Sequence, residues 1–188
     1  MQALRHPDGA ELSDRSVENV PRVPEVKGST NGKKERMNAK KKALFVCSGG
    51  GHLVELLEVK DAFNSMEKHL AIYAKNRIVD DGVFDAVYPV ALPLSVPGLF
   101  RLFVDAFTVL RQVKPAVIVS SGSEITIPFF YIGKLFGARL IYIESCTQVT
   151  SPSITGRIVN PVTDLFLVQW EQIAGKYLKK ARYAGSLL

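Results

Sequence analysis

The sequence holds only two cysteines and three histidines among its 188 residues. Cys47 and Cys146 are too few for a disulfide framework, and neither has neighbouring ligands at the spacing that a structural zinc site requires. Cys47 falls within a predicted buried strand, where a small apolar side chain fits well. The sequence therefore excludes a disulfide-stabilised secreted domain and favours a protein of a reducing cytoplasm without a bound metal.

The chain also lacks a secretory signal and any apolar run long enough to cross a bilayer. We expect residues 1–41 to form a disordered, polar and basic tail ahead of one folded domain over 42–188. Residues 1–42 hold ten Lys/Arg against six Asp/Glu, and residues 43–188 hold fourteen against twelve. Because the domain is nearly balanced, its charge does not indicate nucleic acid, and the tail suits an anionic membrane surface or solubility alike.

Several common nucleotide and hydrolase motifs are missing. Val54 stands where the dinucleotide fingerprint needs its third glycine, and Lys75-Asn76-Arg77 follows the second predicted strand where that fingerprint needs an acid. The one Gly-Lys pair, Gly133-Lys134, is followed by Leu135, so it is no phosphate-binding P-loop. No Gly-x-Ser-x-Gly elbow follows a strand, which excludes the usual α/β-hydrolase nucleophile.

What the sequence does contain is a regular alternation of apolar strands and helical segments. We predict six strands, over Ala43–Ser48, Leu70–Ala74, Ala86–Val90, Ala116–Ser120, Arg139–Ile143 and Leu165–Val168. The predicted helices are Leu53–Ser65, Pro97–Leu110, Ile125–Phe136 with Ser123 as a possible cap, Ser153–Pro161 and Glu171–Lys179. This order predicts an α/β fold with a doubly wound, Rossmann-like parallel sheet.

The helix predicted over Pro97–Leu110 is unusually apolar and aromatic, with only a thin polar stripe. One interpretation is a core helix packed on the sheet. The other is a helix that lies at a membrane surface, since basic residues follow it closely. In the second case the residues in contact with lipid are Leu99, Phe100, Phe103 and Phe107.

Small and polar residues follow four of the predicted strands. In a parallel sheet these strand ends meet at one edge, which is where ligands bind in open α/β folds. Three consecutive glycines after the first strand let backbone amides approach a ligand, and the helix behind them favours an anion. The candidate site residues are Ser48, Gly49, Gly50, Gly51, Glu55, Ser121, Gly122, Glu144 and Ser145 for an acceptor or phosphate, with Gln169 and Trp170 at the rim.

The chemistry of individual side chains stays open at this point. His52 is a candidate general base for a sugar hydroxyl, or it only orients the glycine loop. Glu55, one turn further on, either makes a hydrogen bond, reinforces the start of the helix or lies on a solvated helix face. Glu144 either binds a hydroxyl or pairs with Arg157, and Trp170 is either a stacking platform, an interface residue or part of the core.

Four segments in sequence order carry a family resemblance, namely Ser48–His52, Ile141–Ser145, Ser151–Arg157 and Phe166–Trp170. Together they resemble the PssD-like subunits of bacterial polysaccharide biosynthesis. These subunits are similar to the membrane-anchoring subunit of the two-part UDP-N-acetylglucosaminyltransferase of N-linked oligosaccharide synthesis. The resemblance spans residues 42–188. The glycine loop also resembles that of the lipid II-forming transferase of peptidoglycan synthesis.

The resemblance implies the N-terminal, acceptor-side half of a GT-B glycosyltransferase. Gly49, Gly50 and Gly51 would bind the diphosphate of a lipid-linked acceptor, His52 would lie near the attacking hydroxyl, and Thr155, Gly156 and Arg157 would lie at the rim. A separate donor-binding subunit would carry the UDP-sugar, so we expect a heterodimer, no tightly bound cofactor and no nucleic acid. The resemblance further implies exopolysaccharide or capsule synthesis, peripheral to the inner face of the cell membrane.

Two other classes of function remain compatible with the sequence. The chain could be a scaffold that recruits or activates a catalytic partner without touching substrate. It could also be a small-molecule-binding Rossmann domain unrelated to sugars.

Overall fold

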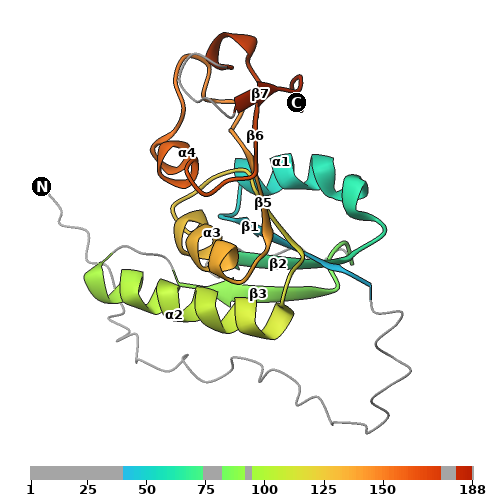
Figure 1. Ribbon diagram of the computed structural model, residues 1–188, viewed down its shortest axis with the longest axis vertical. Coiled ribbons are helices and arrows are strands. Elements are labelled where there is room, and N and C mark those ends of the chain that lie inside the picture. Colours follow the sequence, from blue (N-terminus) through green and yellow to red (C-terminus); the bar gives the residue numbers. More distant parts are fainter. Residues whose placement is uncertain (1–39, 74–81, 92–94, 175–180, 188) are drawn as a thin grey trace, which may run out of the picture. The chain divides into compact units, whose positions relative to one another are not determined.

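A parallel sheet organises the folded part of the chain (Figure 1). The computed structural model describes residues 40–73, 82–91, 95–174 and 181–187, which belong to one unit, Ala39–Leu188. In these residues the strand order is β3-β2-β1-β4-β5-β6-β7, and every neighbouring pair is parallel. The strands are β1 Lys42–Cys47, β2 Glu67–Tyr73, β3 Ala86–Val90, β4 Val117–Ser120, β5 Arg139–Ile143, β6 Leu165–Val168 and β7 Ala181–Tyr183.

Helices connect most of these strands. They are α1 Gly51–Val59, α2 Val96–Val113, α3 Thr126–Leu135 and α4 Ile154–Val159, with short 3₁₀ helices at Lys60–Phe63 (η2) and Glu171–Ile173 (η3). The doubly wound, Rossmann-like sheet predicted from the alternation is confirmed. The six predicted strands are all present, with ends that differ by at most a few residues.

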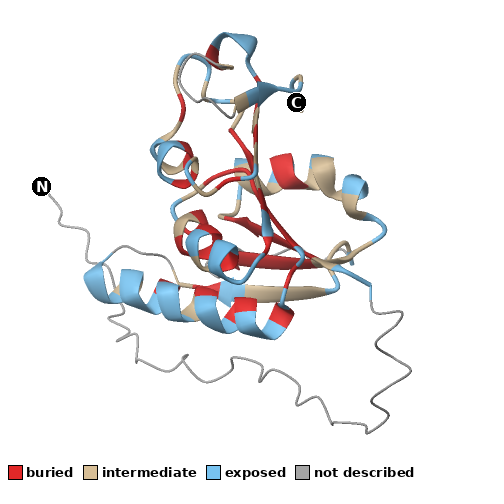
Figure 2. Cartoon of the chain, in the orientation of Figure 1, coloured by how far each residue is buried: buried red, intermediate tan, exposed pale blue. Residues whose placement is uncertain are grey.

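The two faces of the sheet bury separate cores (Figure 2). On one face, Phe45 of β1 packs with Leu56 of α1, and Phe63 of η2 meets the Phe45 ring edge-on at 5.3 Å between centroids. On the other face, Leu44 and Val46 of β1 join the buried residues of α2, α3 and α4. A central strand that is buried on both faces explains why β1 reads as a continuous apolar run.

Helix α2 has a buried face, as the core-helix interpretation requires, and an exposed apolar face whose membrane contact stays a prediction. One side is buried against the sheet through Leu102, Ala106, Val109, Leu110 and Val113. The other side leaves Phe100 73% exposed, and Leu99, Phe103 and Phe107 are between 42% and 45% exposed. Within the part of the chain that the structure describes, no helix is both long enough and apolar enough to cross a membrane.

Some sequence-based boundaries were wrong. The helix predicted over Leu53–Ser65 ends as an α-helix at Val59 and continues as η2. Ser123 does not cap α3, because it adopts a positive φ of 76° and Ile125 occupies the cap position. The helix predicted over Glu171–Lys179 is only η3, since Ala174 is already extended, and residues 175–179 lie outside the described residues.

The direction of the chain reverses about β1. From β1 the chain adds β2 and β3 on one side, and then α2 returns it to the other side of β1, where β4 pairs. The carboxyl ends of β1 and β4 are therefore the topological switch point of the sheet, where open α/β folds bind ligands. The outer strand on the side away from β3 is β7, which pairs with β6 and which the sequence did not predict as a strand. Leu187, which follows it, packs against the core that contains Phe45.

Candidate functional site

A cavity of about 530 Å³ opens at the carboxyl ends of the strands. Its residues come from the first turn of α1, the loop after β4, the end of β5, the segment that leads into α4, and α4 itself. Polar side chains dominate this lining. The lining residues are His52, Gly122, Ser123, Tyr142, Glu144, Ser145, Thr147, Gln148, Ser151, Pro152, Ser153, Ile154, Thr155 and Arg157.

The glycine loop borders this cavity through His52. Gly50 is the N-cap of α1 and has a φ of 77°, a conformation that favours glycine. No side chain caps α1, and its first turn carries no acidic residue. A side chain built at Gly51 would meet nothing within 4 Å. The start of α1 therefore has no side-chain cap, and of its first amides those of Leu53 and Val54 bond to the Gly50 carbonyl. An uncapped helix N-terminus of this kind favours an anion.

His52 lies against the loop that follows β4. A Cβ atom at Gly122 would stand 2.8 Å from Cε1 of the His52 ring and 3.2 Å from its Nδ1. The Ser121 hydroxyl donates a 2.8 Å hydrogen bond to the His52 carbonyl. Ser121 and Gly122 therefore hold the histidine and its backbone at the switch point.

Glu55 is a buried hub behind the cavity, only 1% exposed. Its Oε1 atom accepts hydrogen bonds from the Cys146 amide at 2.7 Å, the Ser145 hydroxyl at 3.0 Å and the Gln169 amide at 3.3 Å. Its Oε2 atom is 3.5 Å from His52 Nδ1. Burial alone would raise the pKa of Glu55, but the His52 ring and the donors of Cys146 and Ser145 hold that pKa below its ordinary value.

Glu144 ends β5 and is equally buried, at 1% exposure. Its Oε2 atom accepts from the Ser153 amide at 3.0 Å, and its Oε1 atom accepts a longer bond of 3.3 Å from the Ser145 amide. With fewer donors, burial dominates and raises the pKa of Glu144 above its ordinary value. Among the described residues Glu144 makes no ion pair with Arg157, so the pairing considered from the sequence is not formed.

Gln169 and Trp170 tie the end of β6 to the end of β5. The buried Gln169 amide donates to the Glu144 carbonyl at 3.0 Å, and its oxygen accepts from the Leu187 amide at 2.9 Å. The Trp170 indole donates to the Cys146 carbonyl at 2.7 Å while the residue stays 37% exposed. Both side chains therefore shape the loop over residues 144–147.

The structure confirms that the four strand ends predicted to share one edge do so. Of the predicted site residues, the cavity lining includes His52, Gly122, Glu144, Ser145, Thr155 and Arg157. The others lie around it or behind it, and their ligand contacts stay predictions: Ser48, Gly49, Gly50, Gly51, Glu55, Ser121, Gly156, Gln169 and Trp170. Gly156 has a packing role, because a Cβ there would meet Glu144 Oε2 at 2.5 Å.

The sequence interpretation missed part of the lining. Tyr142 reads as core and is fully buried, yet its hydroxyl lies 3.1 Å from the Ser153 hydroxyl at the cavity wall. Ser153 also caps α4 by accepting from the Gly156 amide at 2.9 Å. The pattern Ser-x-x-Gly before a short helix could have identified Ser153, whereas nothing in an apolar strand distinguishes Tyr142 from its neighbours.

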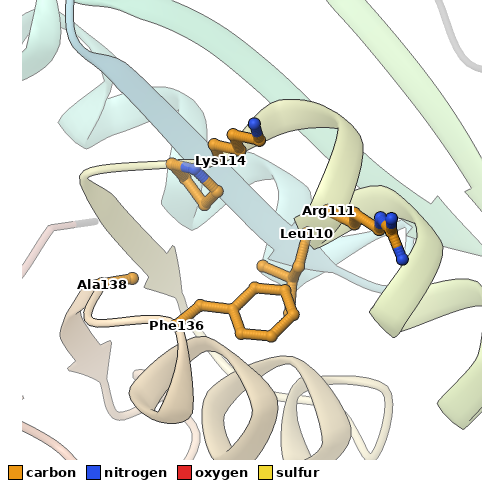
Figure 3. A pocket seen from close by; sticks show the side chains of 6 residues that line it. Leu110, Arg111, Lys114, Phe136 and Ala138 are labelled. Carbon is orange, nitrogen blue, oxygen red and sulfur yellow. The ribbon is translucent and has the colours of Figure 1, made fainter.

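A second hollow lies at the opposite end of the strands (Figure 3). It has a volume of about 390 Å³ and lies where α2 runs into β4 and α3 runs into β5. It is lined by Leu110, Arg111, Lys114, Pro115, Phe136 and Ala138. This hollow is apolar with a basic rim, unlike the polar cavity.

Residues 89–187 match the family model described as "Oligosaccharide biosynthesis protein Alg14 like". The chain belongs to the Alg14-like family. The match runs from the end of β3 through β7, so it includes Glu144 and Arg157 of the cavity but not His52 and the glycine loop.

Curated members of the family from yeasts match parts of the chain. "UDP-N-acetylglucosamine transferase subunit ALG14" of Debaryomyces hansenii is 40% identical over 80 residues, which covers 39% of this chain and 34% of the relative. The protein of the same name from Yarrowia lipolytica is 37% identical over 102 residues, covering 51% and 47%. The matched part of the chain thus spans between about a third and about half of the length of these relatives.

Solved structures with a similar fold have low sequence identity. MurG of Acinetobacter baumannii aligns with a TM-score of 0.63 at 14% identity, covering 77% of this chain and 45% of MurG. UDP-N-acetylglucosamine 2-epimerase of Rickettsia bellii aligns with a TM-score of 0.61 at 13% identity, covering 79% and 45%. At such identities the likeness shows the fold, which is that of one half of a GT-B protein.

Proposed function

We propose that this chain is the acceptor-side subunit of a two-part UDP-sugar glycosyltransferase that acts on a lipid-linked acceptor. The observation that carries the proposal is the polar cavity at the β1–β4 switch point, in a member of the Alg14-like family. The named relatives are transferase subunits, so we expect a second polypeptide to bind the donor, with UDP-N-acetylglucosamine as that donor.

The cavity has the groups that a sugar diphosphate acceptor needs. The uncapped start of α1 offers amides to a phosphate, and the exposed Arg157, which has no ion-pair partner among the described residues, supplies a positive charge at the rim. Ser145, Thr147 and Ser151 add neutral hydrogen-bonding groups for sugar hydroxyls. His52 lines the same cavity, and we propose that the reacting hydroxyl is placed beside it.

We further propose that the exposed face of α2 lies on the membrane that holds the acceptor, at its cytoplasmic side. This face consists of Leu99, Phe100, Phe103 and Phe107. Exposed apolar residues that are grouped in this way, rather than scattered singly, are typical of a membrane or protein contact. The helix begins just after the carboxyl end of β3 and therefore starts on the same edge of the sheet as the cavity. A lipid acceptor could thus reach the cavity without leaving the surface.

The named relatives and the PssD-like resemblance point to different products. The family description and the named relatives support lipid-linked oligosaccharide synthesis. The PssD-like setting of exopolysaccharide or capsule synthesis has no support among these matches and stays a prediction from the resemblance. A scaffold without substrate contact is the second candidate function, favoured by the number of cavity residues whose hydrogen bonds already serve the fold.

Affinity purification of the full chain with its bound partner tests the proposal. Transfer from radiolabelled UDP-N-acetylglucosamine to a polyprenyl-diphosphate-linked sugar would be measured for the wild type and for His52→Ala and Gly50→Ala. We expect both variants to lose transfer while keeping the partner. Gly137→Ala is the matched control, because Gly137 also has a positive φ and open space around its Cβ position but lies at the opposite edge. Full activity of both site variants would favour the scaffold.

A further inference from the structure

His52 and Glu55 lie one helical turn apart at the start of α1. His52 lines the cavity, whereas Glu55 is not among the lining residues. Glu55 is buried, whereas the His52 side chain keeps 29% of its surface exposed. The buried ring atom is Nδ1, which has no hydrogen-bond partner within normal distance, and neither has Oε2 of Glu55. These two unpartnered atoms face each other at 3.5 Å.

The other oxygen of Glu55 cannot turn toward the histidine. Oε1 already accepts hydrogen bonds from Cys146, Ser145 and Gln169. Rotating the carboxylate to bring Oε1 to the histidine would break these three hydrogen bonds. The ring also lies against Gly122, where a Cβ atom would stand only 2.8 Å from Cε1. In this arrangement Nδ1 is the ring nitrogen directed toward the Glu55 carboxylate.

The chemistry of the two facing atoms decides the position of the proton. An ionised carboxylate only accepts hydrogen bonds, so the atom that faces it must carry a hydrogen. Of the other charged groups that line the cavity, Glu144 and Arg157 make no ion pair or hydrogen bond with Nδ1. The proton therefore belongs on Nδ1, which leaves Nε2 with a free lone pair.

We infer that Glu55 is a positioning residue that holds His52 in the Nδ1–H tautomer, so that Nε2 serves as the proton acceptor in the cavity. This inference rests on the proposed function for its catalytic consequence. As the acceptor oxygen forms its bond to the anomeric carbon of the donor, its proton passes to Nε2. The bond from that carbon to UDP breaks, and UDP leaves with the electron pair. Glu55 then stabilises the imidazolium.

The first test needs neither partner nor substrate. Two-dimensional ¹H–¹⁵N NMR of the full chain, labelled at histidine, distinguishes the two tautomers at neutral pH. We expect His52 to be protonated at Nδ1 in the wild type and to lose this preference in Glu55→Gln. A wild-type ring protonated at Nε2 would overturn the inference, whether or not any variant folds.

The second test measures transfer by the purified complex. Glu55→Gln should lower kcat by about 100-fold or more with KM nearly unchanged, and His52→Gln combined with it should add little further loss. Glu58→Gln is the matched control, since it makes the same substitution in α1 at an exposed carboxylate that does not line the cavity. If the tautomer is as inferred but Glu55→Gln keeps full activity, His52 is not the base, and the proposed function still stands.

The basic hollow at the other edge of the sheet carries a second, independent inference. Its floor is apolar, with Leu110 fully buried and Phe136 half exposed. Its rim holds Arg111 and Lys114, and Figure 3 shows both near the end of α2 with Phe136 across from them. Neither cation has an ion pair among the described residues, and no acidic residue lines the hollow. A cation near a helix C-terminus suits the helix dipole, but that does not require a hollow.

The hollow continues the exposed face of α2. The ring of Phe107 meets the ring of Phe136 edge-on, with 5.7 Å between centroids. The same side of α2 that we place on the membrane therefore ends at a cavity with two free positive charges. An occupant with an apolar part and a negative charge matches this surface, and a free phosphate would leave the floor uncovered.

We propose that this hollow binds an anionic phospholipid, its phosphate held by Arg111 and Lys114 and its first methylenes packed on Leu110 and Phe136. The proposal deepens the membrane contact proposed above and rests on it. Lys114 offers a clean variant, because it has left-handed backbone angles (φ 52°, ψ 57°) that glycine adopts more easily. Lys114→Gly thus removes the cation without straining the fold.

Vesicle co-sedimentation of the full chain tests this site. We expect binding to phosphatidylcholine vesicles to rise several-fold when about 30% phosphatidylglycerol is added, a fraction chosen to mimic an anionic membrane. The variants Lys114→Gly and Arg111→Gln should lose that increase. Lys60→Gln is the control, since it removes the same charge at the end of α1, on the opposite face of the sheet. Equal binding to both vesicles, or equal losses in the control, would overturn the lipid site and leave the transferase proposal intact.

Calorimetry with soluble dihexanoylphosphatidylglycerol and with inorganic phosphate distinguishes the two sources of a phosphate group. We expect the short-chain lipid to bind and phosphate alone to bind far more weakly. Phosphate binding as tight as that of the lipid would instead assign the hollow to a free anion and contradict the proposal.

Discussion

Two corners of the same site hold carboxylates that are equally shielded from solvent but whose pKa values shift in opposite directions. At the corner between β1 and α1, Glu55 receives donors from Ser145, Cys146 and Gln169, and its pKa is lowered. At the corner between β5 and α4, burial together with the nearby charge of Glu55 raises the pKa of Glu144, despite hydrogen bonds from the Ser153 amide and hydroxyl and from the more distant Ser145 amide. Both side chains are 1% exposed.

The difference shows that burial alone does not decide the direction of these pKa shifts. Burial raises the pKa of both carboxylates, but at Glu55 the His52 ring and the donors of Cys146 and Ser145 outweigh it, whereas at Glu144 fewer donors and the nearby charge of Glu55 leave burial dominant. The Glu55 corner therefore favours the charged form of its carboxylate more than the Glu144 corner does. Each of the following experiments would weaken or sharpen this contrast.

Glu55→Ala should have the largest effect on stability. It leaves the donors of Cys146, Ser145 and Gln169 without their shared acceptor inside the protein, and we expect a loss of about 3–5 kcal/mol in the free energy of unfolding. Urea unfolding followed by circular dichroism measures it. A loss below about 1 kcal/mol would mean that water replaces the carboxylate and that the corner is not a rigid hub.

Gly156→Ala tests how tightly the Glu144 corner is packed. The new methyl group would lie 2.5 Å from Glu144 Oε2 and 3.2 Å from the Phe166 ring, so we expect a destabilisation of about 1–3 kcal/mol. Thermal unfolding gives the shift in Tm. Gly51→Ala is the control in another helix, where the methyl meets open space and stability should stay the same or rise.

Glu144→Gln should change stability little, within about 1 kcal/mol of the wild type at neutral pH. The amide oxygen can still accept from Ser153, and the variant removes a charge that burial disfavours. Glu55→Gln should be clearly worse in the same urea assay, because its amide group would face donors. Similar losses for the two variants would erase the proposed contrast between the corners.

The pH dependence has opposite signs at the two corners. Glu55 has a lowered pKa, so its contribution is present above its unfolded pKa of about 4.3 and disappears as the pH falls through the folded value. Glu144 has a raised pKa, so stability from its protonated form is lost as the pH rises through its folded value. Unfolding of Glu55→Gln and Glu144→Gln between acidic and neutral pH should show this: the first flattens the fall at low pH and the second does not.

The sequence predicted the sheet because β1, β4 and β5 are buried on both faces and therefore carry uninterrupted apolar runs. It also predicted the shared edge, since polar residues directly follow those runs. It could not predict β7, whose three residues Ala181–Tyr183 form an edge strand with little apolar content. The positive φ of Ser123 was equally hidden, because in the sequence Gly122, and not the serine after it, is the residue suited to such a backbone conformation.

The functional residues divided in the same way. Glu144 and Gly122 stood out because they directly follow strands. Glu55 was also predicted as a site residue, but its place as a shared hydrogen-bond acceptor was not, because that depends on Cys146 and Gln169, which are 91 and 114 residues away along the chain. Contacts of that range follow from the order of strands in the sheet, which no local pattern contains.

Trp170 gives the chain a built-in optical probe. It is the only tryptophan in the sequence, its indole N–H is bonded to the Cys146 carbonyl, and it is partly exposed to solvent. All indole fluorescence of the chain therefore arises beside the loop that Glu55 anchors. A change in its emission on adding an acceptor, a partner or acid would report on that loop directly, without a dye and without a second tryptophan to obscure it.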